Sequence, residues 1–363
     1  MEFINLKAQY AAYKNEIDEK VLGVFGSGQF VMGKEVEALE AELCSFTGAK
    51  HTLSCASGTD ALLLALMALD IKAGDEVITT PFTFIATAEV IALVGAKPVF
   101  VDIDEQTYNI DPSKIEAAIT PKTKAIIPVS LYGQCADMDE INAIAAKHGI
   151  TVVEDAAQSF GAEYKGKKSC NLSRIGCTSF FPSKPLGCYG DGGAVMTNDY
   201  ELAKKIASIR VHGQGERYMH KYIGINGRMD AVQCAITRVK LAHFGEELTA
   251  RARLGARYLK LLADADVVAP FTKEGRTNVY GQFSVRVKNR ETVSKKMNEL
   301  GVPTAVHYPR PLHMQECFAY LGHKVGDFPV SEKVASEIMS LPFSAFLTES
   351  EQDAVVDALK KSL

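Results

Sequence analysis

The chain has no long hydrophobic run and no excess of positive charge. Its apolar stretches, such as residues 86–94, carry charge or fall short of the roughly 20 residues that cross a bilayer, so no membrane association is expected. A formal net charge of −4 offers no basic field to a nucleic acid, so no nucleic-acid partner is expected. An anionic ligand must therefore be held by local groups.

Export and metal-binding signals are absent as well. Residues 1–7 lack the basic and then apolar layout of an export signal, so we expect a cytoplasmic protein. The eight cysteines include no Cys-x-x-Cys pair, and no histidines cluster at metal-ligand spacing. We interpret each cysteine as a small buried hydrophobe and expect no metal.

Three common catalytic signatures are also missing. The glycines at 187, 190, 192 and 193 do not form Gly-x-Gly-x-x-Gly after a first strand, which disfavours a nicotinamide-binding fold. The chain contains no phosphate-binding loop of the Gly-x-x-x-x-Gly-Lys-Ser/Thr type, which disfavours kinases and nucleotide hydrolases. It also lacks Gly-x-Ser-x-Gly, which disfavours serine hydrolases.

What the chain does have is an alternation of strand and helix patterns from about residue 50 to residue 200. Short β-branched runs separated by longer helical periods predict an α/β fold whose parallel sheet is covered on both faces. The predicted strands are 51–56, 76–80, 97–104, 124–131, 151–155, 178–181 and 194–197. The predicted helices between them are 60–69, 84–94, 137–147 and 200–211.

The rest of the chain predicts a second, smaller α+β unit. A long helical pattern with one break runs from 231 to 263 and forms the link. A strand at 281–287, a helix at 291–300 and a closing helix after Thr348 follow. We therefore predict a large domain at 1–245 and a small C-terminal domain at 246–363, with 264–278 as a flexible connection.

One lysine stands in an unusual place. Lys184 follows the β-prone run 177–181, which should lie inside a core. Burial lowers the pKa of a lysine ammonium, and the neutral amine is a better nucleophile and proton carrier. An aldehyde cofactor bound as a Schiff base requires such an amine.

An acidic residue ends a neighbouring predicted strand. Asp155 closes the apolar run 150–155, where a carboxylate is either a helix cap or the partner of a buried cation. Pyridoxal phosphate needs a carboxylate beside its ring nitrogen, so Asp155 and Lys184 together predict a site for that cofactor.

Three further loops reach the same predicted edge of the sheet, where ligands of parallel sheets bind. Residues 57–60, Ser-Gly-Thr-Asp, are either a simple helix cap or a phosphate seat in which Gly58 allows close approach. Phe84 is either a core residue or an aromatic that stacks on a pyridine ring. Gln158 is either a solvated helix residue or a donor to the cofactor's phenolic oxygen.

Taken together, these segments resemble the sugar aminotransferases of the DegT/DnrJ/StrS family. The resemblance extends over nearly the whole chain, from 33–40 through 58–62, 154–159 and 226–230 to 307–309. It implies the aspartate aminotransferase-like fold type I of pyridoxal phosphate enzymes, with a large, mostly parallel sheet domain and a small α+β C-terminal domain.

The resemblance also implies roles for single residues. Lys184 would form the Schiff base; some family members carry histidine there and dehydrate sugars, so the lysine favours transamination. The cofactor-binding set would be Gly58, Thr59, Phe84, Asp155, Gln158, Ser179 and Asn226. Within it, Asp155 would face the ring nitrogen and Asn226 the phosphate of the neighbouring subunit's cofactor. A homodimer with shared active sites is therefore implied.

Substrate contacts are predicted with alternatives left open. Arg228 is a candidate cation for a substrate carboxylate, or else part of an ion pair. His307 and Tyr308 are candidates for the sugar pocket, although the histidine could make a purely structural hydrogen bond. The family often has tyrosine where Ile225 stands here, so contacts of that tyrosine do not carry over.

Within the family, segments 129–137, 169–173 and 181–191 are most similar to the UDP-2-acetamido-2-deoxy-ribo-hexuluronate 3-keto aminotransferases of O-antigen biosynthesis. This similarity implies transfer of an amino group from glutamate to C3 of a UDP-linked 3-keto-2-acetamido-hexuronate. One alternative is a C4 aminotransferase of a 4-keto-6-deoxy sugar nucleotide. Another is a non-catalytic regulatory protein that binds pyridoxal phosphate, a role that would want a helix-turn-helix domain.

Overall fold

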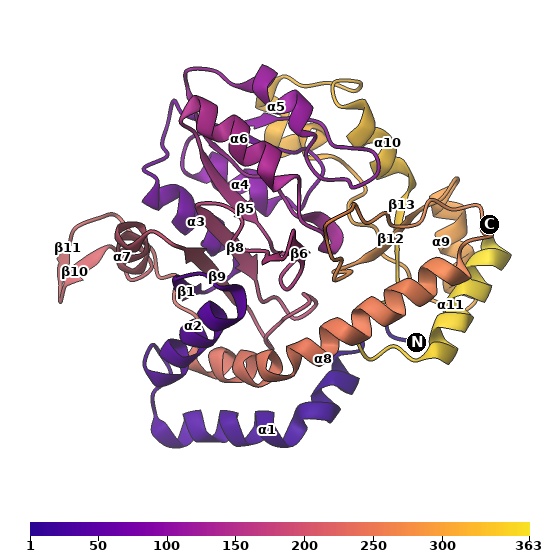
Figure 1. The fold of residues 1–363 in the computed structure, drawn as a ribbon, viewed down its shortest axis with the longest axis horizontal. Coiled ribbons are helices and arrows are strands. Elements are labelled where there is room, and N and C mark those ends of the chain that lie inside the picture. Colours follow the sequence, from indigo (N-terminus) through magenta and orange to yellow (C-terminus); the bar gives the residue numbers. More distant parts are fainter.

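A seven-stranded sheet forms the centre of the computed structural model, which describes residues 1–363 (Figure 1). The strand order is β1-β9-β8-β5-β4-β2-β3. The bounds are His51–Cys55 (β1), Glu76–Thr79 (β2), Lys97–Phe100 (β3), Thr123–Ile126 (β4), Thr151–Asp155 (β5), Ile175–Ser179 (β8) and Gly193–Thr197 (β9). Every strand predicted for this sheet is present, with bounds shifted by a few residues.

The sheet is mostly parallel, and β9 is its exception. β9 pairs antiparallel with both β1 and β8, whereas the other neighbours pair in parallel. No crossover helix separates β8 from β9, so the chain turns back and must enter the sheet in the opposite direction. A strand pattern alone carries no information on that direction.

Helices cover both faces because alternate residues of each central strand face opposite layers. In β9, Val195 packs in a cluster with Leu64 and Ile206, while Met196 packs in another with Leu39. The covering helices are Lys34–Thr47 (α2), Gly58–Ala68 (α3), Ala86–Leu93 (α4), Pro112–Ala118 (α5), Met138–His148 (α6) and Tyr200–Ile209 (α7). Of these, α2 and α5 lie outside the predicted helices.

The longest helix, Ala231–Leu261 (α8), is continuous, which corrects the predicted break. Gly245 lowers the helix propensity of α8 by about 1 kcal/mol. The helix nevertheless has buried side chains both before and after this glycine in the sequence, among them Phe244 and Tyr258. Helix Leu6–Ser27 (α1) packs along α8, as Figure 1 shows. The predicted boundary at 245/246 falls inside α8, and the division into two domains stays a prediction.

The C-terminal part has its own apolar cluster, which includes Phe283, Met339 and Val355. Its elements are Phe283–Arg286 (β12), Arg290–Glu299 (α9), Pro329–Glu337 (α10), Ile338–Leu341 (β13) and Glu349–Ser362 (α11). The short remaining elements are Glu163–Tyr164 (β6), Lys167–Lys168 (β7), Gln214–Glu216 (β10), Met219–His220 (β11), and the 3₁₀ helices Leu131–Gly133, Leu312–Met314 and Glu316–Leu321.

Hydrogen bonds and an ion pair join the connection 264–278 to loops of the large sheet, which corrects the prediction of a flexible segment. The Arg276 guanidinium donates to the Cys135 carbonyl oxygen at 2.6 Å and pairs with the Asp137 carboxylate. The Lys165 amide donates to the Gly275 carbonyl oxygen at 2.6 Å. Buried ion pairs of this kind cannot be located from spacing in the sequence.

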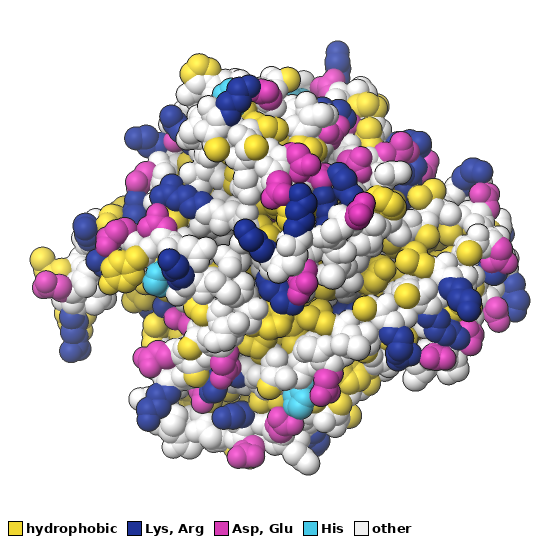
Figure 2. All heavy atoms as spheres, in the orientation of Figure 1, with side chains coloured by type: hydrophobic (Ala, Val, Ile, Leu, Met, Phe, Trp, Pro, Cys, Tyr) yellow, Lys and Arg dark blue, Asp and Glu magenta, His cyan; other side chains and the backbone are white.

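Figure 2 shows acidic and basic side chains interspersed over one face of the molecule. None of the helices combines the length and the apolarity that a membrane crossing demands. Six of the cysteines are buried, whereas Cys44 is partly exposed and Cys317 is exposed, so the interpretation as a buried hydrophobe is wrong for Cys317.

Candidate active site

Four strands of the sheet, β1, β2, β5 and β8, point the same way, so the loops that follow them meet at one edge. They surround a cavity of about 440 Å³. This cavity gathers nine of the residues singled out in the sequence: Gly58, Thr59, Phe84, Asp155, Gln158, Ser179, Lys184, His307 and Tyr308. The convergence of these loops follows from the topology of parallel strands.

Asp155 ends β5, and Lys184 lies in the turn after β8. These two strands are neighbours, with Asp155 paired opposite Cys177. Asp155 is 5% exposed. Its Oδ2 accepts from the Thr87 hydroxyl at 2.8 Å and its Oδ1 from the Ala157 amide at 3.2 Å. Burial raises the pKa of the Asp155 carboxyl, and these hydrogen bonds and the charge of Lys184 oppose the rise.

Lys184 lies in a turn held by its own backbone, because its amide donates to the Phe181 carbonyl oxygen at 2.9 Å. Burial lowers the pKa of the Lys184 ammonium, while the Asp155 carboxylate acts in the opposite direction. The same turn needs Gly187, since a Cβ there would lie 2.5 Å from the Phe181 carbonyl oxygen. Lys240, buried on α8, donates to the Gly187 carbonyl oxygen and anchors the turn.

The amino end of α3 forms a cradle beside this turn. Ser57 caps the helix by accepting from the Asp60 amide at 3.0 Å, and the first amides of a helix have no partner within it. A Cβ at Gly58 would lie 2.5 Å from the Ser179 Cβ, so only glycine lets the two loops approach this closely. The cradle can bind an anion such as a phosphate.

Gln158 is 2% exposed, which excludes its interpretation as a solvated residue. Its Oε1 accepts from the Tyr132 amide at 3.0 Å, and its Nε2 donates to the Tyr308 hydroxyl at 3.0 Å. Phe84 is 52% exposed beside Tyr308, with the two ring centroids 6.0 Å apart, so Phe84 is not a core residue. Its ring is free to stack on a flat ligand.

His307 makes the structural hydrogen bond that the sequence left open, between its Nδ1 and the Ser340 hydroxyl at 2.9 Å. It also lines the cavity. Burial, aided by the charge of Lys184, lowers the pKa of His307 to about 4, so its ring is neutral at pH 7. Burial raises the pKa of the Tyr308 phenol.

Asn226 and Arg228 lie outside this cavity in the single chain. Asn226 is exposed and forms an isolated antiparallel β-bridge with Val211. Arg228 is partly buried. The Nε of Arg228 is buried without a hydrogen-bond partner. Their roles in binding stay predictions.

Sequence reasoning missed five further polar residues that line the cavity: Thr83, Thr87, Ser183, Asp191 and Gln282. The signal for two of them was available, because Thr83 and Thr87 are four residues apart near the start of a predicted helix. Gln282 follows no motif, and its Oε1 is buried without a partner. It reaches the cavity because the neighbouring Gly281 lies against the Gln158 backbone, where a Cβ would be 2.5 Å from the carbonyl oxygen.

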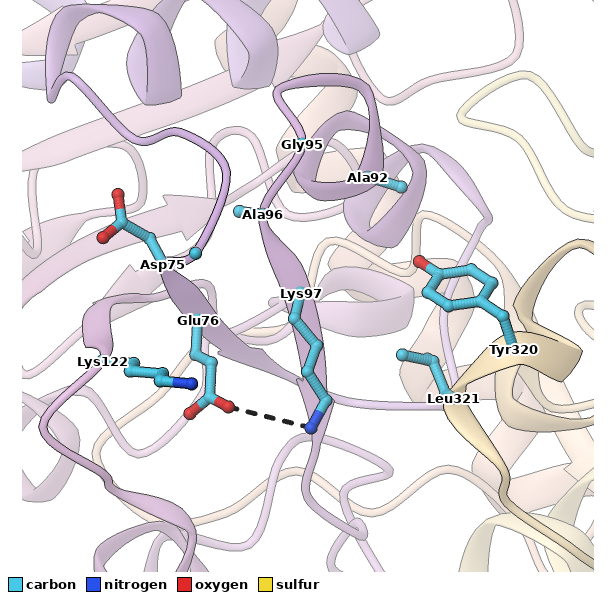
Figure 3. Close-up of a pocket in the computed structure, with 10 residues that line it drawn as sticks. Asp75, Glu76, Ala92, Gly95, Ala96, Lys97, Lys122, Tyr320 and Leu321 are labelled. Atoms are coloured by element: carbon cyan, nitrogen blue, oxygen red, sulfur yellow. Dashed lines mark ion pairs between the residues drawn. The ribbon is translucent and has the colours of Figure 1, made fainter.

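A second cavity, of about 560 Å³, lies at the opposite edge of the sheet, where β2 and β3 begin (Figure 3). Its carboxylate Glu76 pairs with Lys97, whose Nζ lies 3.7 Å from Oε1. None of the residues predicted for the site lines it. No group of three or more His, Cys, Asp or Glu side chains that could hold a metal ion occurs in the structure.

A carboxylate that ends one strand and a lysine in the turn after the neighbouring strand lie beside an anion cradle at the carboxyl edge of a mostly parallel sheet, and this arrangement defines the aspartate aminotransferase-like fold type I class. The chain belongs to the DegT/DnrJ/EryC1/StrS aminotransferase family, whose family model matches residues 11–360. The resemblance and the fold class read from the sequence are thereby confirmed.

Two relatives are similar over almost the full length. A UDP-2-acetamido-2-deoxy-3-oxo-D-glucuronate aminotransferase of Pseudomonas aeruginosa is 54% identical, over 99% of this chain and 99% of its own. A protein of Geobacillus stearothermophilus named pleiotropic regulatory protein is 48% identical, over 98% of this chain and 96% of its own.

Solved structures share the fold. An aminotransferase of the same family from Brucella abortus has a TM-score of 0.97 at 40% identity, covering 99% of both chains. NtdA from Bacillus subtilis, solved with bound cofactor PMP, has a TM-score of 0.90 at 34% identity, covering 96% of this chain and 81% of its own.

Proposed function

We propose that the protein is a pyridoxal phosphate-dependent aminotransferase that moves an amino group from glutamate to C3 of a UDP-linked 3-keto-2-acetamido-hexuronate. The observation that carries this proposal is that Lys184 and Asp155 line the same cavity. The 54% identity to an aminotransferase of such a 3-oxo sugar, over the full length, supports the substrate.

The residues present fit this cofactor. The cradle at Gly58 matches a phosphate, the lowered pKa of Lys184 matches an amine that attacks an aldehyde, and Asp155 offers a buried acceptor. When bound, pyridoxal phosphate supplies an aldehyde that condenses with amines and a ring that withdraws electrons from the adjoining carbon.

Lys184 performs two tasks in this proposal. Its amine would hold the cofactor's aldehyde until the amino group of glutamate takes its place. The freed amine would carry the proton from the glutamate α-carbon to the cofactor side, and water would then release 2-oxoglutarate while the amino group stays on the cofactor. The keto sugar is aminated by the same steps in reverse, so one lysine carries the proton in both halves.

The residues around Lys184 bind and orient. With the cofactor bound, Asp155 would accept from the ring nitrogen, Gln158 would contact the phenolic oxygen, and Phe84 would stack on the ring. The phosphate is held by Gly58, Thr59 and Ser179. His307 and Tyr308 line the part of the cavity that receives the sugar.

Both proposed substrates carry a carboxylate, and Arg228 is our candidate for its partner because a guanidinium matches a carboxylate with two parallel hydrogen bonds. In the single chain, Arg228 and Asn226 stand outside the cavity. We therefore propose a homodimer in which Asn226 of one subunit reaches the other's cofactor phosphate. We also propose a cytoplasmic location and a role in O-antigen synthesis.

The experiment is a substrate panel. Enzyme loaded with the amino form of the cofactor is mixed with single keto sugar nucleotides, and the return of visible absorbance is followed. UDP-2-acetamido-3-oxo-glucuronate should restore it, and 4-keto-6-deoxy sugar nucleotides should not. Restoration by the 4-keto sugars alone would mean a C4 aminotransferase.

A regulatory protein that binds the cofactor without turnover is a second candidate, favoured by the name of the Geobacillus relative. The complete set of Lys184, Asp155 and the cradle at Gly58 favours catalysis. Steady-state turnover with glutamate and the keto sugar separates the two, because a regulator would bind both and release no product.

A further inference from the structure

A chain of two threonine hydroxyls leads to Asp155: Thr87, in α4, bonds the carboxylate, and Thr83, in the turn before α4, bonds Thr87. Thr83 and Thr87 are 2% and 1% exposed, and both line the cavity. Their hydroxyl oxygens lie 3.1 Å apart, and the Thr87 oxygen lies 2.8 Å from the Asp155 Oδ2. Neither threonine belongs to the cofactor-binding set described above.

The direction of this chain of hydrogen bonds follows from counting protons. A threonine hydroxyl has one proton to donate. Thr87 gives its proton to Asp155, so Thr83 must be the donor in the bond between the two hydroxyls. The second carboxylate oxygen of Asp155 accepts from the Ala157 amide. Both oxygens of Asp155 are thus held by donors, and its orientation toward the cavity is fixed.

We propose that Thr83 and Thr87 are positioning residues that form a two-hydroxyl relay and hold Asp155 as a charged, oriented acceptor for the ring nitrogen. This inference rests on the proposed function, because the relay has this role only if Asp155 faces the ring nitrogen of the cofactor. It deepens the proposal by explaining how a buried carboxylate stays ionised.

The relay is needed because burial works against the charge of Asp155. The titratable groups whose charges act on Asp155 are Lys184, Cys177, Tyr308 and, from the opposite face of β5, Glu154. Burial raises the pKa of each of the last three, which disfavours their charged forms. Lys184 is the single cation among the four, and its amine is bound and released during turnover. The hydroxyl donors remain in place throughout.

The test replaces Thr87 with valine, which keeps the branched shape and removes the donor. Without that hydrogen bond the carboxyl of Asp155 becomes more basic, so it draws the shared proton away from the ring nitrogen. In T87V loaded with ¹⁵N-labelled pyridoxal phosphate, the ring nitrogen resonance should move toward its unprotonated position. The single-turnover rate with glutamate should fall by about tenfold, with KM for glutamate changed less than about twofold.

Serine is the matched control, because T87S keeps the hydroxyl and should recover both the resonance and the rate. T83V removes the outer donor and should move the resonance in the same direction by a smaller amount. This second variant decides the question if T87V does not fold. A wild-type resonance in a folded T87V, or in T83V when T87V does not fold, overturns the relay, as does a T87S as impaired as T87V.

These results separate the relay from the proposed function. If the wild-type protein neither binds pyridoxal phosphate nor aminates any keto sugar, the proposed function fails and the relay with it. If the wild-type protein transaminates and the valine variants keep its resonance, the function stands and the relay alone is wrong.

Discussion

The close approach of Gly58 to Ser179 in the site leads to a sharp prediction for Gly58→Ala. The added Cβ would lie 2.5 Å from the Ser179 Cβ and 3.1 Å from its hydroxyl oxygen. Carbon atoms pack at about 3.5–4.0 Å, so the loops after β1 and β8 must separate by about 1 Å. Overpacking of this kind costs about 1–3 kcal/mol of folding free energy.

The same separation moves the first amides of α3 away from the phosphate. A misplacement of about 1 Å in a binding site can cost up to about 100-fold. We expect G58A to bind pyridoxal phosphate at least about tenfold more weakly, which corresponds to ~1.4 kcal/mol. Affinity is measured by titrating the apoprotein and following visible absorbance, and stability by urea unfolding of the apoprotein.

The matched control is Gly245→Ala in the middle of α8, where an added Cβ meets no atom within 4 Å. That variant should leave affinity unchanged and should raise the free energy of unfolding by about 0.5–1 kcal/mol, because alanine restricts the unfolded chain and favours the helix. Wild-type affinity in G58A would refute the reasoning that this contact seats the phosphate.

The remaining predictions concern Lys184 and His307. Lys184→Ala should abolish turnover and the visible absorbance of the loaded enzyme; normal turnover would end the assignment of the lysine. The pKa of His307 is lowered from an ordinary 6.5 to about 4, so the unfolded chain binds more protons between these values and stability rises with pH across that window. Urea unfolding from pH 4.5 to 7 should show this rise, by up to about 3 kcal/mol, and His307→Gln should flatten it. An equal slope in both proteins would contradict the burial of a neutral ring.

Most of the large sheet could be predicted from sequence because its strands are buried on both faces. A strand such as β9, with all five residues buried, has the mostly apolar sequence Gly-Ala-Val-Met-Thr between turn signals. Helix α1 was not predicted, since its apolar positions do not stand out from its polar ones. Helix α10 was not predicted either. The antiparallel direction of β9 was not predicted, because it follows from the lack of a helix between β8 and β9.

The candidate site was predictable where a motif lies at the end of a strand. Asp155 and Lys184 each follow such a strand, and the pairing of β5 with β8 brings them together. Gln282 and Thr87 could not be assigned in the same way. Gln282 reaches the cavity through packing between distant segments, and the bond from Thr87 to Asp155 joins residues 68 positions apart.

The glycines after Lys184 show how one pattern changes meaning with its surroundings. In the sequence, their spacing disfavours a nicotinamide-binding fold. In the structure, they allow neighbouring segments to approach closely. A Cβ at Gly192 would lie 2.6 Å from the Met229 Cε, and one at Gly193 would lie 2.4 Å from the Ser57 carbonyl oxygen. The contact at Gly193 brings the start of β9 against the loop that begins α3, and the contact at Gly192 brings it against the segment before α8. Because no helix intervenes in that return, Lys184 stays in a short turn beside the anion cradle, close enough for one small molecule to reach both.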